Sequence, residues 1–224
     1  MGIKHWPTQQ RPRERLIREG ASALSDPELL ALFLRVGLPG KSAVELGREL
    51  IGHFGSLQGL FGASLAQFCA VRGMGPAKFA QLQAVMELAQ RAIGEQLRTG
   101  QALASPHAVR TFLRMQLSNQ PHESFLVLFL DVKNRLLACD EMFRGTLTHT
   151  SVYPREVLKA ALGYNAASVM FAHNHPSGMA DPSEADLLLT RALVEALRLV
   201  DVRVLDHFVI AGAQVHSFAE NGQM

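Results

Sequence analysis

The sequence has few cysteines and no long apolar run. Cys69 and Cys139 are the only two cysteines, and they lie too far apart in the sequence to form a pair motif. We therefore expect reduced, packed thiols in a cytoplasmic protein rather than a disulfide framework. No apolar stretch approaches the ~20 residues of a membrane span. Residues 1–7 lack the apolar centre of a signal peptide, so no membrane partner is expected.

The sequence also lacks a strong excess of either charge, since its formal net charge is +2. Residues 1–100 carry 12 Lys and Arg against 8 Asp and Glu, whereas residues 101–224 carry 10 against 12. The first part is therefore mildly basic, at +4. That balance is compatible with nucleic-acid binding but does not require it.

At 224 residues the chain is long enough for two small domains. Residues 1–95 read as an all-α domain, with helix starts at Ser25 and Ser42 and glycine turns between helices. The helical periodicity breaks from Gly94 to Pro106, so residues 96–104 are predicted to be a linker. Residues 105–224 form the second predicted domain.

A glycine turn lies within the first domain, at residues 71–78. This stretch resembles a helix-hairpin-helix motif, in which backbone N–H groups at the start of a helix bind a DNA phosphate. The resemblance implies non-specific DNA contacts by Gly73, Gly75 and Lys78. A glycine-rich turn between helices is equally typical of plain architecture, and the sequence leaves both interpretations open.

The second domain alternates between helical and strand patterns, which favours a mixed sheet flanked by helices, an α/β/α arrangement. The whole chain is therefore predicted to be α+β. The predicted strands are 125–130, 135–143, 146–152, 166–172, 202–210 and 214–218, and the predicted helices begin at 105, 154 and 182.

Two histidines follow the fourth predicted strand. Because side chains alternate along a strand, His173 and His175 are expected on the same side of its end. Asp186 lies in or just past the first turn of the next helix. Two imidazoles and one carboxylate form a three-ligand set with an open fourth position, which is typical of catalytic zinc. The alternative is that the histidines are ordinary loop residues and Asp186 is an ordinary polar residue of the helix.

The start of that next helix is predicted from its capping residues. Asp181 is the expected N-cap, Pro182 the first helical residue, and Glu184 the partner that closes a capping box.

The spacing of these residues also resembles a known family. His-x-His, seven residues and then Ser-x-x-Asp is similar to the zinc signature of JAMM (JAB1/MPN+) metalloproteases, and His-Asn-His-Pro-Ser-Gly resembles the RadC branch. The sequences at residues 11–14, 24–30 and 154–157 also resemble those of the RadC family. The resemblance implies a JAMM/MPN-like fold, one Zn²⁺ per chain held by His173, His175 and Asp186, and hydrolysis of a peptide or isopeptide in an unidentified protein substrate.

A hydrolase of this kind needs a general base, and three glutamates lie upstream of the ligands: Glu123, Glu141 and Glu156. The family pattern favours Glu123, just ahead of the first strand, with Glu141 as the reserve. The resemblance implies that Ser183 donates to the developing oxyanion. His207, next to Asp206 in a predicted strand, is interpreted as a structural residue in preference to a support for the metal ligands.

The alternative function is a DNA-binding, repair-associated protein whose metal site is structural or serves another hydrolysis. A closed four-ligand site would favour that function, and a set of three ligands favours the hydrolase. A nuclease would more often use clustered carboxylates for paired hard metals.

Overall fold

The computed structural model describes residues 3–99, 106–118, 120–145 and 152–224. The chain divides into two compact units, Met1–Glu87 and Leu88–Met224. The division falls inside helix α6 (Pro76–Arg98), so that helix contributes residues to both units. Among the described residues, no helix has the length and apolar character needed to cross a membrane.

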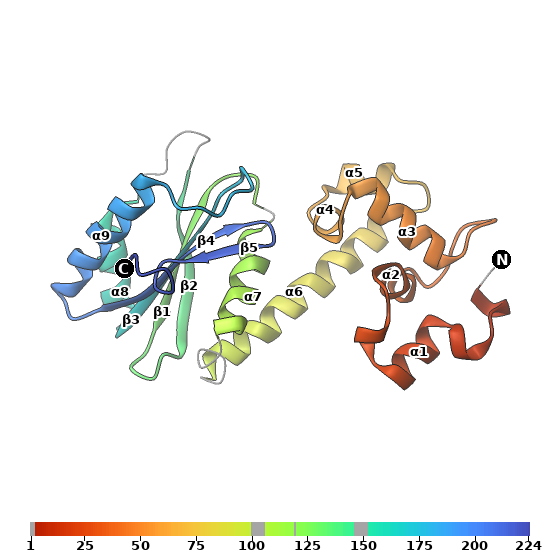
Figure 1. The fold of residues 1–224 in the computed structure, drawn as a ribbon, viewed down its shortest axis with the longest axis horizontal. Helices are drawn as coiled ribbons and strands as arrows, with labels where there is room; N and C mark the ends of the chain where they lie inside the picture. Colours follow the sequence, from red (N-terminus) through yellow and green to blue (C-terminus); the bar gives the residue numbers. More distant parts are fainter. Residues whose placement is uncertain (1–2, 100–105, 119, 146–151) are drawn as a thin grey trace. The chain divides into compact units, whose positions relative to one another are not determined.

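The first unit consists of short helices (Figure 1). Ser25 and Ser42 open α2 and α3, as predicted. Each forms a capping box, in which the glutamate three residues on accepts a bond from the serine backbone. The apolar faces meet in a core that includes Leu46, Leu50 and Phe68. The α-helices are α1 (Pro12–Glu19), α2 (Asp26–Leu34), α3 (Ala43–Phe54), α4 (Leu57–Phe61), α5 (Leu65–Ala70) and the first part of α6.

The predicted break in helical structure at Gly94 is wrong, because α6 continues to Arg98. A glycine inside a helix costs only about 1 kcal/mol relative to alanine. Here Leu97 is fully buried and Ile93 packs against the same core, which offsets that cost. Phe112 lies beside Gly94, close to where a side chain would begin. Of the predicted linker, residues 96–98 are therefore helical, and residues 100–104 lie outside the described part of the chain.

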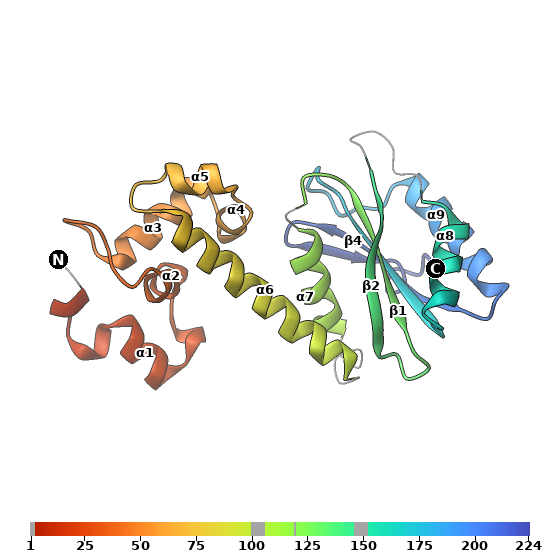
Figure 2. The same cartoon turned by 180° about the vertical axis from the view of Figure 1, so that it is seen from behind.

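The second unit contains a five-stranded mixed sheet, seen from opposite sides in Figures 1 and 2. Its order is β2-β1-β3-β4-β5, with β3 and β4 parallel and the other neighbours antiparallel. The strands are β1 (Ser124–Leu130), β2 (Leu136–Arg144), β3 (Ser168–Asn174), β4 (Arg203–Ala211) and β5 (Gln214–Ser217). The further strand predicted at residues 146–152 lies almost wholly outside the described residues.

Helices cover both faces of this sheet, which confirms the predicted α/β/α layers and the α+β class (Figure 2). Helix α7 (Pro106–Leu117) packs on the face that carries Leu126 and Leu128. Helices α8 (Pro154–Gly163) and α9 (Glu184–Arg198) pack on the face that carries Val127 and Phe171. Strand β1 is buried along its whole length because both of its faces are covered.

Candidate metal centre

The two histidines are placed by the alternation of β3. Val169 and Phe171 belong to the core cluster under α8 and α9, so His173, two residues further on, faces the same helices. His175 lies just past the end of the strand, and its backbone N–H still donates to the Ile210 carbonyl of β4 at 2.9 Å. Both imidazoles therefore lie on the α9 side of the sheet, as the sequence predicts.

The carboxylate is placed by the start of α9, and here the predicted cap is wrong. Ser183, not Asp181, is the N-cap, and Asp186 rather than Glu184 completes the capping box. The Ser183 hydroxyl accepts from the Asp186 backbone N–H at 3.2 Å. The Asp186 carboxylate in turn accepts from the Ser183 backbone and hydroxyl, both at 2.7 Å. Reciprocal bonds of this kind fix the helix start, so Pro182 lies outside the helix.

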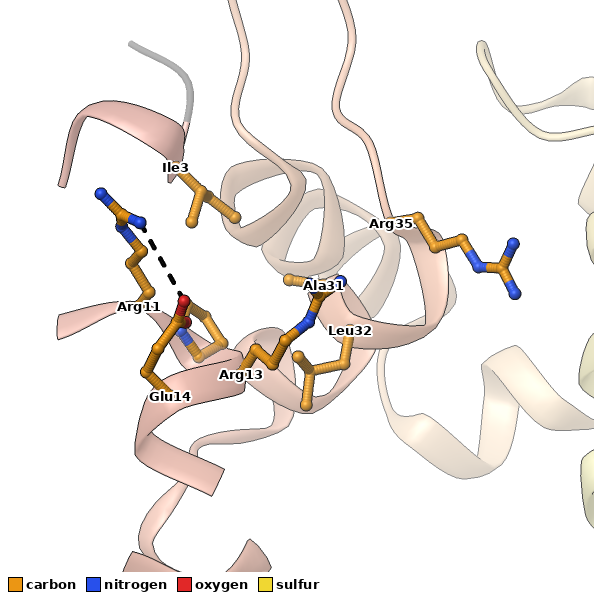
Figure 3. A pocket seen from close by; sticks show the side chains of 8 residues that line it. Ile3, Arg11, Arg13, Glu14, Ala31, Leu32 and Arg35 are labelled. Carbon is orange, nitrogen blue, oxygen red and sulfur yellow. Dashed lines mark ion pairs between the residues drawn. The ribbon is translucent and has the colours of Figure 1, made fainter. Parts of the chain in front are cut away.

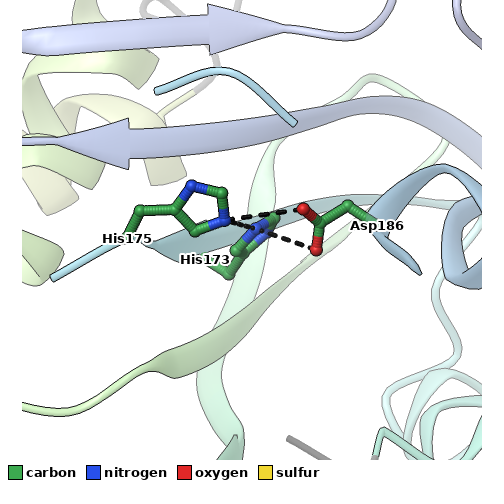
Figure 4. A group of neighbouring side chains, drawn as sticks. All are labelled: His173, His175 and Asp186. Carbon is green, nitrogen blue, oxygen red and sulfur yellow. Dashed lines mark hydrogen bonds and ion pairs between the residues drawn. The ribbon is translucent and has the colours of Figure 1, made fainter. Parts of the chain in front are cut away.

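The three side chains converge on one point (Figure 4). His173 Nε2 lies 3.0 Å from His175 Nε2 and 3.3 Å from Asp186 Oδ1. His175 Nε2 lies 3.5 Å from Asp186 Oδ2. A tetrahedral zinc with bonds of ~2.0–2.2 Å separates its ligand atoms by about 3.3–3.5 Å. The two imidazole nitrogens and the two oxygens of Asp186 make contacts of 3.0–3.5 Å, close to that spacing, so the residues fit the ion.

The electrostatics of the group also favour a cation. Burial alone would raise the pKa of Asp186, but the neighbouring imidazoles of His173 and His175 and the hydroxyl of Ser183 together hold it well below its usual range. The bond to Asp186 raises the pKa of His175, with a smaller contribution from the charge of Glu123. His175 Nδ1 lies 2.9 Å from the Met179 carbonyl, which can only accept. In neutral His175 the lone pair of Nε2 therefore faces the point of convergence.

The two candidate bases differ in how they are engaged. Glu123 immediately precedes β1, and its carboxylate acts electrostatically on His175. Glu141 on β2 accepts two bonds from Arg144 at 2.9 Å and one from Ser124 at 2.8 Å. Its bonds to Arg144, helped by the one from Ser124, lower the pKa of Glu141 to about 2 despite some burial. Glu141 is therefore an ion-pair partner in this structure.

Asn174, between the two histidines, fastens the segment that carries Glu123. Its Oδ1 accepts from the Ser124 backbone N–H at 2.8 Å, and its Nδ2 donates to the His122 carbonyl at 2.9 Å. These are the neighbours of Glu123 on either side. Asn174 is almost fully buried. Asn174 therefore links β3 to the segment that carries the candidate base Glu123. The sequence analysis missed this link.

Replacing Asn174 should destabilise the second unit. Asn174→Ala leaves the buried Ser124 N–H without a partner, and an unsatisfied buried group costs about 1–3 kcal/mol. We expect a loss of that size in the free energy of unfolding, measured by urea denaturation. Asn221→Ala is the matched control, since exposed Asn221 makes one bond to the Ser217 carbonyl and should cost under ~1 kcal/mol. Equal effects from both substitutions would contradict this role.

The residues predicted to bind DNA form a turn between α5 and α6. Gly73 has φ +85°, and a Cβ there would lie 2.6 Å from the Leu38 side chain, so this glycine is required by the fold. Gly75 has open space around its Cα. Lys78 Nζ donates to the Gly73 carbonyl at 2.7 Å and so closes the turn. Each of these contacts is explained by architecture alone, and DNA contact at the turn stays a prediction.

A cavity of about 240 Å³ in the first unit is separate from the metal ligands (Figure 3). Arg11 and Glu14 form an ion pair of 4.0 Å across one side of it, and Ala31 and Leu32 give it an apolar side. None of the predicted site residues lines it. The full lining is Ile3, Arg11, Pro12, Arg13, Glu14, Ala31, Leu32 and Arg35.

Comparison with known proteins identifies the class and then the family. Residues 103–223, which contain the sheet and the His-His-Asp group, match the model of the RadC-like JAB domain. Residues 3–80 match the UPF0758 N-terminal model. The JAB match covers more than half of the chain, and the chain belongs to the RadC family.

Relatives match over the full length of the chain. The UPF0758 protein of Herminiimonas arsenicoxydans is 67% identical over 224 residues, 100% of both chains. The UPF0758 protein of a Janthinobacterium strain (Marseille) is 62% identical over the same span. That of Nitrosomonas eutropha is 59% identical over 222 residues, 99% of both chains. The family resemblance stated from the sequence is thereby confirmed.

Proposed function

We propose that the protein is a zinc-dependent hydrolase of the JAMM type that cleaves a peptide or isopeptide bond. The observation that carries the proposal is the convergence of His173, His175 and Asp186, with donor atoms 3.0–3.5 Å apart. Two imidazole lone pairs and a carboxylate that face one another at such distances repel unless a proton or a cation lies among them. Membership of the JAB class, which includes metalloproteases, supports the same assignment.

The number of ligands supports a catalytic rather than a structural ion. Structural zinc is closed by four protein ligands, whereas catalytic zinc keeps a position open for water or substrate. Within the described ranges, the group that can hold a metal has three members. Bound zinc supplies a Lewis acid that polarises a carbonyl and lowers the pKa of a water.

The residues around the ligands then have separate tasks. Glu123 takes the proton from the attacking water and later passes it to the leaving amine, as a general base must. Glu141 is less suited to this task, because a carboxylate paired with Arg144 and with a pKa of about 2 holds a proton poorly at neutral pH. Glu156 lies in the first turn of α8, where it stabilises the helix dipole.

The predicted oxyanion role of Ser183 depends on its hydroxyl proton. In this structure that proton is directed to Asp186 Oδ2. The same bond holds the carboxylate in place, which leaves Oδ1 facing His173. Ser183 therefore positions a ligand, and donation to an oxyanion requires the hydroxyl to turn away from Asp186.

The proposal is tested by measuring zinc and hydrolysis together. Purified protein should contain one zinc per chain by elemental analysis. It should cleave members of peptide and isopeptide libraries, lose that activity in a chelator and regain it when zinc is added back. A chain that binds zinc fully but cleaves no member of either library would support the structural-metal alternative.

A second candidate function is DNA binding by the first unit, which we propose from the turn at Gly73–Gly75. The backbone N–H groups of these glycines make no hydrogen bond among the described residues, so they are available to a phosphate. The +4 charge of residues 1–100 supports the same partner. Phosphate contacts carry no sequence information, so such binding would be non-specific.

This DNA binding should be weak and sensitive to salt. We expect a Kd on the order of 10⁻⁴–10⁻⁶ M at physiological salt, measured by fluorescence anisotropy of labelled duplex with the full chain. Lys78→Ala should make the log–log salt slope shallower by about one contact. Gly75→Val should weaken binding without unfolding, because space around Gly75 is open and a side chain there blocks phosphate approach. If neither substitution changed the affinity, the turn would serve only to connect the two helices.

A further inference from the structure

A chain of hydrogen bonds leads from one metal ligand to another through the interior. His173 Nδ1 lies 2.9 Å from His207 Nε2, and His207 Nδ1 lies 2.7 Å from Thr190 Oγ1. The Thr190 hydroxyl then lies 2.6 Å from the Asp186 backbone carbonyl. The four residues come from β3, β4 and α9. The two ends of the chain are His173 and Asp186, which the proposed function assigns to the metal.

The position of each proton follows from the Asp186 end of the chain. A backbone carbonyl can only accept, so the single hydroxyl hydrogen of Thr190 is directed to Asp186. The Thr190 oxygen therefore presents a lone pair to His207 Nδ1. That contact is a hydrogen bond only if Nδ1 of His207 carries a proton.

The second half of the chain follows from the surroundings of His207. Its side chain is fully buried and stacks on Phe218 with ring centroids 4.7 Å apart, while Phe125 and Phe171 meet it edge-on. Its ring nitrogens contact a hydroxyl and another imidazole. A charged ring would be costly there, so His207 carries one proton, on Nδ1. Its Nε2 must accept, and the donor is Nδ1–H of His173.

We propose that Thr190 and His207 are positioning residues that fix His173 in the Nδ1–H tautomer and so direct its Nε2 lone pair to the metal point before an ion binds. The proposal rests on the proposed metal site but adds residues outside the three ligands. Metal-ligating histidines usually donate their second N–H to such a partner. Here the partner is another histidine, His207. Its own tautomer is set by Thr190, which lies one turn along α9 from the ligand Asp186.

The alternative arrangement makes the inference specific. If Thr190 did not hold the proton of His207 on Nδ1, His207 could carry it on Nε2 and donate to His173. His173 would then hold its proton on Nε2, against Asp186, with no lone pair for a metal. Thr190 is linked to His173 through His207, yet it decides between these two states.

The first experiment reads tautomers in metal-free protein, so it does not depend on zinc binding. Long-range ¹⁵N–¹H spectra of histidine-labelled full-length protein should show Nδ1–H for both His173 and His207. Thr190→Val keeps the side-chain shape but removes the hydroxyl, and it should shift His173 toward Nε2–H. Thr190→Ser keeps the hydroxyl and should retain the wild-type tautomers. A wild-type His173 protonated on Nε2, or a Thr190→Val spectrum identical to wild type, would overturn the proposal.

The second experiment measures zinc affinity by competition with a chromophoric chelator. Thr190→Val and His207→Phe should each bind zinc about 10–100-fold more weakly, the usual effect of losing a partner behind a ligand. Thr190→Ser should stay near wild type, and so should His207→Gln, whose amide can both accept and donate. Thr190→Val provides the test if His207→Phe does not fold. Wild type that binds no zinc would refute the proposed function, whereas tight wild-type binding matched by Thr190→Val would refute only this inference.

Discussion

Glu123→Gln should retain zinc but lose about 10²–10⁴-fold in the rate of hydrolysis, because the amide has the size of the carboxylate but cannot accept the proton of water. The loss should fall on kcat rather than on substrate affinity. The measurement is the hydrolysis rate of a substrate found in the peptide and isopeptide libraries, with zinc content determined on the same samples. Of the substitutions that leave zinc in place, this one should have the largest effect on catalysis.

Glu141→Gln is the matched control, since it makes the same chemical change 18 positions further along the chain. It weakens the bonds from Arg144 and Ser124, so a modest loss of stability is expected with catalysis retained within several-fold. The reverse pattern, with Glu123→Gln active and Glu141→Gln inactive, would transfer the general base to Glu141.

His175→Ala should remove stoichiometric zinc. Losing one of three ligands should weaken binding by more than the about 10–100-fold seen when only an outer partner is lost. His175 is the best ligand to replace because its side chain is 18% exposed, against 2% for His173. Replacing Asp186 would also break the capping box of α9. Zinc per chain is measured by elemental analysis after gel filtration.

His216→Ala is the control for this experiment. His216 lies on β5, two strands from the ligands on β3, and its imidazole contacts Gln223. It should keep one zinc per chain. Full zinc retention in the His173→Ala/His175→Ala double variant would contradict the assignment of the metal site.

The sequence predicts those parts of the fold that depend on neighbouring residues. Ser25 and Ser42 open helices because each has a glutamate three residues on. The alternation of β3 predicts that His173 and His175 share a side of the sheet. The same reasoning gives the wrong cap at α9, because residues 181–186 contain two overlapping cap patterns. Asp181 with Glu184 and Ser183 with Asp186 both have the required spacing, and only the second forms the reciprocal bonds.

Other features depend on contacts between distant residues. Gly94 remains helical because Leu97 and Phe112 pack at the end of α6, which local periodicity does not reveal. His207 reaches His173 because β3 and β4 pair in parallel with Phe171 opposite His207. That register is set by the packing of the whole sheet. An interpretation of His207 from its neighbours alone therefore gives a structural residue and misses its contact with a ligand.

The capping box of α9 would link retention of the proposed zinc to local unfolding of the helix start. When the first turn of α9 frays, Ser183 releases the carboxylate of Asp186, and a bound zinc would lose its third ligand at the same moment. An ion that binds only the closed turn must stabilise it by RT ln(1 + [Zn]/Kd), about 2.7 kcal/mol at a hundredfold excess over Kd. The Asp186 amide, whose hydrogen bond to Ser183 closes the turn, is thus a reporter of occupancy by hydrogen exchange.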